Sequence, residues 1–446
     1  MHWRADQHGG WTRCAGWHHR RARARRRHRP DAGGRTRSLG RCHGPAGPQA
    51  PDDGTRRTHL LSWLRMNRHE FIDMARENMA HVEAGNTPSQ ADAVYRVPAA
   101  NYLDPVRWQR EVDLFRRLPL MLALGGELRE PGAYKALTVM DTPVLITRGN
   151  DGAVSAFVNS CSHRGAVVVP DGAGVARRFA CPYHNWTYNS SGELVGVTDR
   201  EHFGDIDTAC LGLTPLPCAE RAGLVFVVLT PGTPMDIDAH LCGYGQLLDF
   251  FGFGDWHLVS RKELQGPNWK IAYDGYLDFY HLPFLHRATF GTEISNKAIY
   301  RAWGPHQRMT SPDPKLLALR DVHEDDWDLD LMCSGVWTIF PHISFAGNHS
   351  GGLVSQLFPG STPGSSTTIQ NYFVADEPTE AQRAEAVQRA EFLEMVVRDE
   401  DYYTGIRQQR ALATGAKTEV LFGRNEGGGQ RFHQLLQEYL DAPLSR

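Results

Sequence analysis

The chain has 446 residues, of which 41% are hydrophobic and 22% charged, and its formal net charge is −3. This length allows two or three domains with buried cores, and no apolar run reaches the roughly 18–20 residues of a membrane-spanning helix. The eight cysteines are too scattered for a disulfide-stabilised secreted protein, and no secretory leader is evident. We therefore expect a cytoplasmic protein with reduced thiols and no membrane partner.

Residues 1–65 differ in charge from the rest of the chain. They carry 15 Arg, no Lys and four Asp, a net charge of +11, which leaves −14 for the other residues. Because this segment has no hydrophobic period and few aliphatic residues, we expect it to be disordered. A nucleic-acid-binding arm and a transit peptide are alternatives. The lack of Lys and the onset of ordinary protein sequence at Met66 favour translation from too early a start codon, and hence no nucleic-acid partner.

Residues 66–118 predict two N-terminal helices. Four apolar residues recur at helical spacing in the first, and Gly85 can end it; they are Phe71, Met74, Ala75 and Met79. Residues 104–118 predict the second helix. Residues 119–230 then change to short strand-like runs broken by Gly and Pro, with a strong hairpin signal at "NDG" (150–152). This segment is expected to be a small all-β domain.

Two Cys-and-His pairs lie in the predicted loops of the β domain, Cys161-x-His163 and Cys181-x-x-His184. Zinc, an iron–sulfur cluster and a redox dithiol with nearby histidines are the possible uses of such a set. Zinc fingers usually group their two cysteines together and their two histidines together. Here each loop supplies one Cys and one His, which suits a two-iron cluster whose thiolates hold one iron and whose imidazoles hold the other.

The stretches "CSHRG" and "CPYHN" resemble the Rieske [2Fe–2S] domains of Rieske-type non-haem iron aromatic ring-hydroxylating oxygenases, in their alpha (catalytic) subunit. The resemblance implies that Cys161 and Cys181 bind one iron and that His163 and His184 bind the other. In the oxygenases a Gly usually stands where this chain has Asn185. Since Asn tolerates a positive φ best after Gly, we expect the loop conformation to be kept.

Respiratory Rieske proteins carry an extra disulfide between these loops, whereas this chain has Ala166 and Tyr183 at the two positions. The family resemblance therefore favours the oxygenases, and it implies an α+β fold. The expected parts are an all-β Rieske domain at 119–230 and a catalytic domain at 231–446, with an antiparallel sheet flanked by helices (helix-grip type).

The catalytic part contains a second pair of histidines, His281 and His286, in "DFYHLPFLH". Residues five apart point about 140° apart on an ideal helix, so both can reach one metal only if the helix breaks, and Pro283 is expected to break it. Two histidines and one carboxylate form the facial triad that leaves three positions open on Fe(II). The alternative is two partly buried structural histidines.

The carboxylate candidates are Asp399, Glu400 and Asp401, on a long helix predicted over residues 378–414. Helical spacing does not separate the three, and a solvated acidic face is the alternative. The family has a matching stretch of an acidic pair followed by Gln and Leu, and this resemblance places the ligand at Asp401. Asp278, three residues before His281, suits a carboxylate that orients a ligand histidine; the resemblance implies that Asp278 also bridges to His184 of a neighbouring subunit, and hence a homotrimer or an alpha3beta3 assembly.

The resemblance implies a terminal oxygenase that activates O₂ at a mononuclear Fe²⁺ and oxidises an aromatic or hydrophobic small molecule. The outcome would be dihydroxylation, hydroxylation or demethylation. The chain has neither G-x-G-x-x-G nor G-x-x-x-x-G-K-[ST], so NAD(P)H is expected to act only through a separate reductase, with or without a ferredoxin. A Rieske electron carrier without oxygenase activity and a zinc-binding interaction module are the alternatives.

Overall fold

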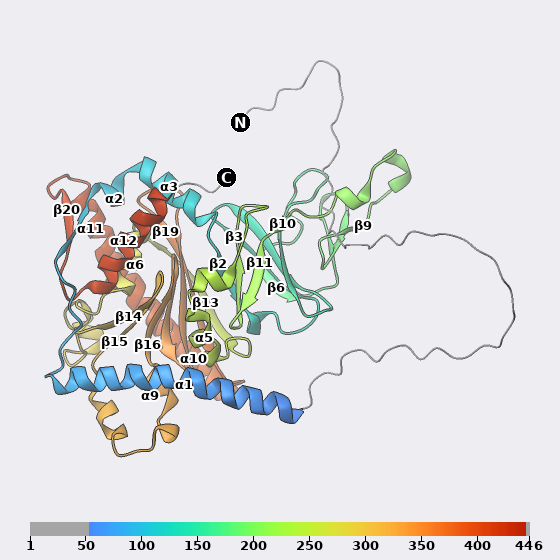
Figure 1. The fold of residues 1–446 in the computed structure, drawn as a ribbon. Helices are drawn as coiled ribbons and strands as arrows, with labels where there is room; N and C mark the ends of the chain where they lie inside the picture. The colour runs from blue at the N-terminus through green and yellow to red at the C-terminus, as the bar shows by residue number, and fades with distance from the viewer. Residues whose placement is uncertain (1–52, 443–446) are drawn as a thin grey trace, which may run out of the picture.

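The computed structural model describes residues 53–442, with side chains from Arg68 onward. It begins with α1 (Asp53–Glu83), a long helix along one side of the molecule (Figure 1). Residues 53–65 were expected to be disordered and are helical instead. The sequence has no Pro or Gly between Gly54 and Gly85, so no helix-breaking residue stops the helix from starting before Met66. Residues 1–52 and the question of the start codon lie outside the described residues.

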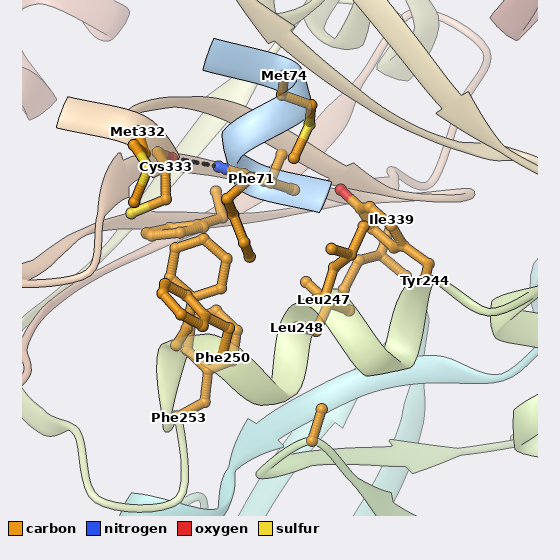
Figure 2. Close-up of a cluster of buried hydrophobic side chains, with 14 of the residues drawn as sticks. Phe71, Met74, Tyr244, Leu247, Leu248, Phe250, Phe253, Met332, Cys333 and Ile339 are labelled. Carbon is orange, nitrogen blue, oxygen red and sulfur yellow. Dashed lines mark hydrogen bonds between the residues drawn. The ribbon is translucent and has the colours of Figure 1, made fainter. Parts of the chain in front are cut away.

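The apolar side predicted for α1 is buried, as expected. Phe71, Met74, Ala75 and Met79 are all less than 8% exposed, and the Phe71 ring lies 4.4 Å from that of Phe250 between centroids. Figure 2 shows this cluster, in which α1 packs against the helical segment 244–251 and the sheet residue Ile339. Because these partners belong to the second half of the chain, α1 is part of the core of that half.

The segment between α1 and residue 118 adds one strand and two helices to this core. The helix predicted at 104–118 is α3 (Pro105–Phe115), and the Asp104 side chain caps it by accepting from the amide of Val106. It follows β1 (Tyr95–Pro98) and the short α2 (Ala100–Leu103). Strand β1 pairs antiparallel with β20 (Glu419–Phe422), so an early segment and a late segment form one small sheet.

The following segment is all-β, as predicted. A five-stranded antiparallel sheet has the order β10-β5-β4-β3-β6, and two three-stranded sheets have the orders β11-β12-β2 and β7-β8-β9. The hairpin expected at 150–152 joins β4 and β5, and Gly152 has a φ of +79°. The strands are β2 (Leu120–Leu124), β3 (Ala133–Val139), β4 (Thr142–Arg148), β5 (Val154–Val158), β6 (Gly172–Val175), β7 (Arg178–Ala180), β8 (Thr187–Asn189), β9 (Leu194–Gly196), β10 (Pro215–Leu216), β11 (Cys218–Arg221) and β12 (Leu224–Val227).

The second half is built on a seven-stranded antiparallel sheet with the order β13-β19-β18-β17-β16-β15-β14. Its strands are β13 (His257–Gly266), β14 (Ile299–Trp303), β15 (His306–Thr310), β16 (Gly335–Ile339), β17 (Ile343–Asn348), β18 (Gly351–Pro359) and β19 (Ser366–Val374). The helices around it are α4 (Ile237–Leu241), α5 (Tyr244–Leu248), α6 (Trp269–Tyr276), α7 (Leu282–Leu285), α8 (Arg287–Phe290), α9 (Leu329–Cys333), α10 (Glu380–Val396), α11 (Tyr403–Leu412) and α12 (Gly427–Asp441).

Both faces of this sheet are covered. Val354 packs with Phe71 and Phe345 in the core beneath α1, whereas its neighbour Leu353 packs with Ala390 of α10 on the opposite face. Successive side chains of a strand point to opposite faces, so this alternation assigns α1 and α10 to different sides of the sheet. Helix α6 contacts β18 and β19. Within the described residues, no helix combines the length and apolar character needed to cross a bilayer.

Candidate metal centres

The two Cys/His loops of the β domain have the same backbone hydrogen bonds. The amides of Cys161 and Cys181 each donate, over 2.8 Å, to the carbonyl five residues later. Their carbonyls accept from the residue four positions later, Gly165 at 2.8 Å and Asn185 at 2.9 Å. That residue has a positive φ in both loops, +77° for Gly165 and +59° for Asn185. Asn185 therefore keeps the loop conformation predicted for it.

The side chains of both loops point to one small region. The thiols of Cys161 and Cys181 are free and only 4% and 2% exposed. The rings of His163 and His184 lie 4.5 Å apart between centroids, and Trp186 stacks on His163 at 4.9 Å. His163 Nδ1 is buried and has no hydrogen-bond partner, which is unusual for a polar atom in a protein interior. Two free thiols and an unpartnered imidazole nitrogen are the donor set that an iron–sulfur cluster with mixed ligands requires.

Two thiols and two imidazoles can hold one zinc ion or the two irons of a Rieske cluster. Among the described residues, one set of three or more possible ligands has all its ligand atoms within 4.8 Å of one another, and it does not include the Cys/His loops. The sulfur of Cys161 also lies 3.3 Å from the hydroxyl of Tyr188, a neighbour of the kind that tunes the potential of a cluster.

The set that meets the limit consists of His281, His286 and Asp401. One helical turn connects the two histidines, since His281 caps α7 and the amide of His286 donates to Leu282 at 3.2 Å. The expectation that Pro283 breaks a helix between them was wrong: Pro283 occupies the first turn of α7, where a missing N–H is tolerated. The chain bends at His286 instead (φ −93°, ψ 20°), between α7 and α8, and the two rings lie 5.1 Å apart.

The carboxylates come from an interruption of the long C-terminal helix. The single helix predicted at 378–414 is divided into α10 and α11 by a π-helical segment at Val397–Tyr402. A π-turn is wider than an α-turn, so consecutive side chains diverge less and two can serve one site. Asp401 Oδ1 lies 3.5 Å from His281 Nε2 and 3.3 Å from His286 Nε2. Asp399 is exposed and bonds to its neighbour Arg398.

A second carboxylate contacts each histidine at Nδ1, the ring nitrogen that does not face Asp401. Asp278 Oδ2 lies 3.0 Å from Nδ1 of His281, and Glu400 Oε2 lies 2.5 Å from Nδ1 of His286. When a carboxylate accepts a hydrogen bond from Nδ1–H, the proton stays on Nδ1 and the lone pair remains on Nε2, the atom that faces Asp401. The role of Glu400 was not predicted, because the sequence pattern placed it only among three equivalent acids.

The electrostatics of this group favour a cation. Burial would lower the pKa of His281, but hydrogen bonds to Asp278 and Asp401 raise it to about 9. The pKa of His286 is likewise raised against burial by its bonds to Asp401 and Glu400. Burial raises the pKa of Asp401, yet the two imidazoles lower it below the usual value. A divalent cation between the three groups would therefore compete with protons.

Two protein-family models match the chain. Residues 119–210 match the Rieske [2Fe-2S] domain, and residues 253–442 match the catalytic domain of the ring-hydroxylating alpha subunit. The chain belongs to the Rieske oxygenase alpha subunits. This family combines a Rieske cluster with a non-haem iron, and it uses O₂ and electrons from a separate reductase. The catalytic-domain match covers residues 253–442, a region that an electron carrier or a zinc module would not need.

Curated relatives of this Rieske oxygenase include large subunits of dioxygenases and monooxygenases. The chain is 33% identical over 42% of its length to the large oxygenase component of the 2,4-dinitrotoluene dioxygenase system of Burkholderia sp. (strain RASC). It is 31% identical over 44% of its length to the carnitine monooxygenase oxygenase subunit of Acinetobacter pittii. The matches span 43% and 53% of these relatives, so the chain spans about half the length of the curated relatives it matches.

Solved structures support the fold of this Rieske oxygenase. A quaternary ammonium Rieske monooxygenase in complex with L-carnitine matches 78% of the chain and 97% of its own, at 23% identity and a TM-score of 0.66. Naphthalene 1,2-dioxygenase from Rhodococcus sp. matches 83% of the chain and 98% of its own, at 18% identity and a TM-score of 0.63. The α+β architecture with a Rieske domain and a catalytic domain is thereby confirmed.

Proposed function

We propose that this chain is the terminal oxygenase component of an oxygenase system that oxidises an aromatic or other hydrophobic small molecule with O₂. The observation that carries the proposal is the group of His281, His286 and Asp401, whose ligand atoms lie within 4.8 Å of one another. Both imidazoles are held at Nδ1 by carboxylates, which is how metal-binding histidines are usually oriented. These three residues would hold Fe²⁺, and Cys161, Cys181, His163 and His184 would hold the [2Fe–2S] cluster.

The residues of the mononuclear site are of two kinds: those that would bind the metal and those that orient the metal-binding histidines. The imidazoles of His281 and His286 and the carboxylate of Asp401 would hold Fe²⁺, a ligand set that is typical of iron sites at which O₂ is activated. When bound, the iron supplies the reductive activation of O₂ that yields a dihydroxylated, hydroxylated or demethylated product. Asp278 and Glu400 keep the Nδ1 protons in place, so that Nε2 of each histidine stays available as a ligand.

Electrons would enter from a separate reductase, with or without a ferredoxin, through the cluster held by the two Cys/His loops. Replacing two thiolates by imidazoles raises the reduction potential of such a cluster, which suits an acceptor of electrons from a partner. The Tyr183 side chain, stacked on His184 at 3.8 Å, is 57% exposed. This exposed tip is therefore available to another protein surface.

We also infer assembly into a homotrimer or an alpha3beta3 complex, with Asp278 of one subunit facing His184 of the next. Asp278 is part-exposed and lines a cavity of about 260 Å³ together with His281 and Asp401. Exposed aromatic residues lie close to it in the chain, with Tyr280 at 51% and Phe284 at 67% exposed. The two rings lie 6.1 Å apart between centroids, so they form one exposed apolar patch, a feature that is found at protein interfaces.

The decisive experiment is purification of the full chain without oxygen, followed by metal and sulfide analysis. About three irons and two acid-labile sulfides per chain, with a red-brown colour, are expected; a colourless zinc protein would contradict the proposal. His281→Ala should lose about one iron and all substrate oxidation but keep the visible spectrum of the cluster. Unchanged oxidation by this variant would show that the mononuclear site is elsewhere.

Asp278→Asn separates electron transfer from metal binding. The variant should retain both metals and yet show little turnover with a surrogate reductase, because the carboxylate that connects the two centres is lost. Retained turnover would contradict the bridge. Sedimentation of the wild-type chain, alone and with a candidate beta subunit, tests the assembly independently.

A further inference from the structure

Three polar side chains from three different helices share hydrogen bonds at the end of α6. Oδ1 of Asp274 lies 2.9 Å from Nε2 of His433 on α12, and Oδ2 accepts from the hydroxyl of Tyr102 on α2 at 2.9 Å. The same hydroxyl lies 3.0 Å from Nε2 of His433. Each group therefore contacts the other two, and we call these three residues the Asp274 triangle.

Among these three side chains, only that of Asp274 lines the cavity of about 260 Å³ that His281 and Asp401 also line. The Asp274 side chain is 17% exposed, whereas that of His433 is 1% exposed. Tyr102 is buried as well. Asp274 is therefore the member of the triangle that can exchange a proton with a molecule in the cavity.

The Asp274 triangle can hold its protons in two arrangements. When His433 is protonated, Nε2–H donates to Oδ1 of Asp274 and the Tyr102 hydroxyl donates to Oδ2. When the Nε2 proton moves to Asp274, Nε2 becomes an acceptor, and the Tyr102 hydroxyl can turn to it over 3.0 Å. Burial and the neighbouring Asp274 raise the pKa of Tyr102 well above its usual value, so this hydroxyl remains a donor in both arrangements.

The second ring nitrogen does not fix His433 in one protonation state. Nδ1 is buried and has no hydrogen-bond partner within the described residues. The rings that surround it, Phe422 and Phe432, lie 5.0 Å away between centroids. Buried polar atoms normally have a partner, and the exceptions are often found at sites with a catalytic role. The contacts with Asp274 and Tyr102 are thus the ones that set the charge of His433.

The reaction of the proposed site takes up protons. Hydroxylation of a C–H bond by O₂ consumes two electrons and two protons and releases one water, and dihydroxylation of an arene also takes up two of each. The reductase would supply the electrons. In the proposed assembly a neighbouring subunit faces Asp278, which lines the same cavity, so bulk water would reach this cavity less readily. A proton donor in the cavity wall would meet the need.

We infer that Asp274, hydrogen-bonded to His433 and Tyr102, transfers one of the two protons of each turnover to the cavity of the mononuclear site. The Nε2–H bond of His433 breaks as an O–H bond forms on Asp274. Asp274 then gives this proton to water or to the oxygen that is being reduced in the cavity. His433 ends neutral and Asp274 ends ionised, and water returns the proton to His433 through Asp274 between turnovers. The inference rests on the proposed function and adds a proton-transfer residue to it.

Nitrogen NMR tests the shared proton without turnover. The sample is the full chain with ¹⁵N-labelled histidine, an oxidised cluster and diamagnetic Zn²⁺ in place of Fe²⁺, and His433→Gln identifies the signals of His433 by their loss. The Nε2 signal should lie between the positions of a protonated and an unprotonated ring nitrogen. Asp274→Asn should move it to one of these positions, because an amide cannot take up the proton. A signal that lies at one of them and stays there in Asp274→Asn would overturn the inference.

Turnover with a surrogate reductase is the second test. Asp274→Asn should keep the iron content and the visible spectrum of the cluster. It should consume O₂ at least tenfold more slowly, with a larger solvent deuterium isotope effect than the wild type, because proton transfer becomes rate-limiting.

Glu426→Gln is the matched control, since Glu426 lines the same cavity but accepts from the amide of Gly423 instead. Its rate and isotope effect should equal those of the wild type, and equal changes in both variants would contradict the inference. If Asp274→Asn does not fold, Tyr102→Phe decides, because it removes the donor that Nε2 needs after the transfer and should slow O₂ consumption with the same isotope effect. A chain that oxidises its substrate while the proton of His433 stays fixed would defeat only this inference, whereas a chain without iron would defeat the proposed function.

Discussion

Oε2 of Glu400 lies 2.5 Å from Nδ1 of His286. Glu400 directly precedes the proposed iron ligand Asp401, and it orients the ring of His286, which is another proposed ligand. The π-helical segment makes this possible, because it turns two consecutive carboxylates toward one histidine. Glu400 also accepts a hydrogen bond from Thr289. The carboxylate is therefore fixed on both oxygens before any metal binds.

Glu400→Ala is expected to weaken iron binding by about 10- to 100-fold, the usual effect of removing a carboxylate behind a metal-binding histidine. The measurement is iron retained at equilibrium with a chelator of known affinity. Asp399→Asn is the control, because Asp399 is the exposed neighbour in the same segment. Equal losses in the two variants would mean that Glu400 contributes only general negative charge.

The Cys/His loop at 181–186 gives a prediction about backbone conformation. Asn185 has a φ of +59°, so Asn185→Gly should leave stability unchanged or slightly higher. Asn185→Ala should cost about 1 kcal/mol of the free energy of unfolding, because Ala keeps the Cβ but lacks the short polar side chain that makes the left-handed region accessible to Asn. Urea unfolding followed by visible absorbance of the cluster measures both. Equal stability of the Ala and Gly variants would contradict the conformation.

A buried ion pair joins α3 to the helix that leads to the mononuclear site. Glu111 and Lys270 are both fully buried, and Glu111 also accepts from the indole of Trp269 at 2.9 Å. Lys270→Met removes one partner of a buried pair, for which we expect a loss of about 3–5 kcal/mol in the free energy of unfolding.

Chemical denaturation of the Lys270→Met variant is the test. Arg96→Met breaks the exposed pair between Arg96 and Glu419, and it should cost no more than about 1 kcal/mol. A similar small cost for both variants would show that Arg107, which also pairs with Glu111, neutralises the Glu111 carboxylate when Lys270 is removed.

Two buried histidines make stability depend on pH. Burial lowers the pKa of His306 and of His342 to about 3. Both ring nitrogens of His306 are used, Nε2 as a donor to His240 and Nδ1 as an acceptor from the amide of Phe340, so a second proton has no place. Their stabilising effect is full above the unfolded pKa of about 6.5 and is lost as the pH falls below it.

Each of these histidines should lower the free energy of unfolding by about 2 kcal/mol between pH 7 and pH 5, since only the unfolded state binds the proton. Urea unfolding at both pH values measures the difference. His306→Gln should show a shallower dependence, whereas His69→Gln, at an exposed position, should match the wild type. An unchanged slope in His306→Gln would contradict this account.

Much of the architecture could be predicted because its signals are local. The positive φ of Asn185 follows from residue type, and the buried side of α1 follows from the spacing of Phe71 and Met79. The geometry behind the mononuclear site is not local. The apolar spacing of a π-helical segment differs little from that of an α-helix, so neither the interruption at Val397–Tyr402 nor the contact of Glu400 with His286 could be predicted.

Two other features depended on tertiary contacts. Pro283 is compatible both with a helix break and with a first helical turn, and only the bend at His286 distinguishes them. Arg308 has no sequence feature that separates it from a surface arginine. It is buried because α1 and α9, far apart in the chain, both lie against its strand.

The pairing of β1 with β20 has a consequence for the order of synthesis. Strand β1 and helix α1 leave the ribosome before the Rieske domain, whereas their partners lie beyond it, at Phe250, Ile339 and residues 419–422. The Rieske domain can thus fold as a unit while the catalytic core is still incomplete. Until Phe250 and Ile339 have been synthesised, the apolar side of α1 lacks these partners, so we expect this segment of the nascent chain to be bound by a chaperone.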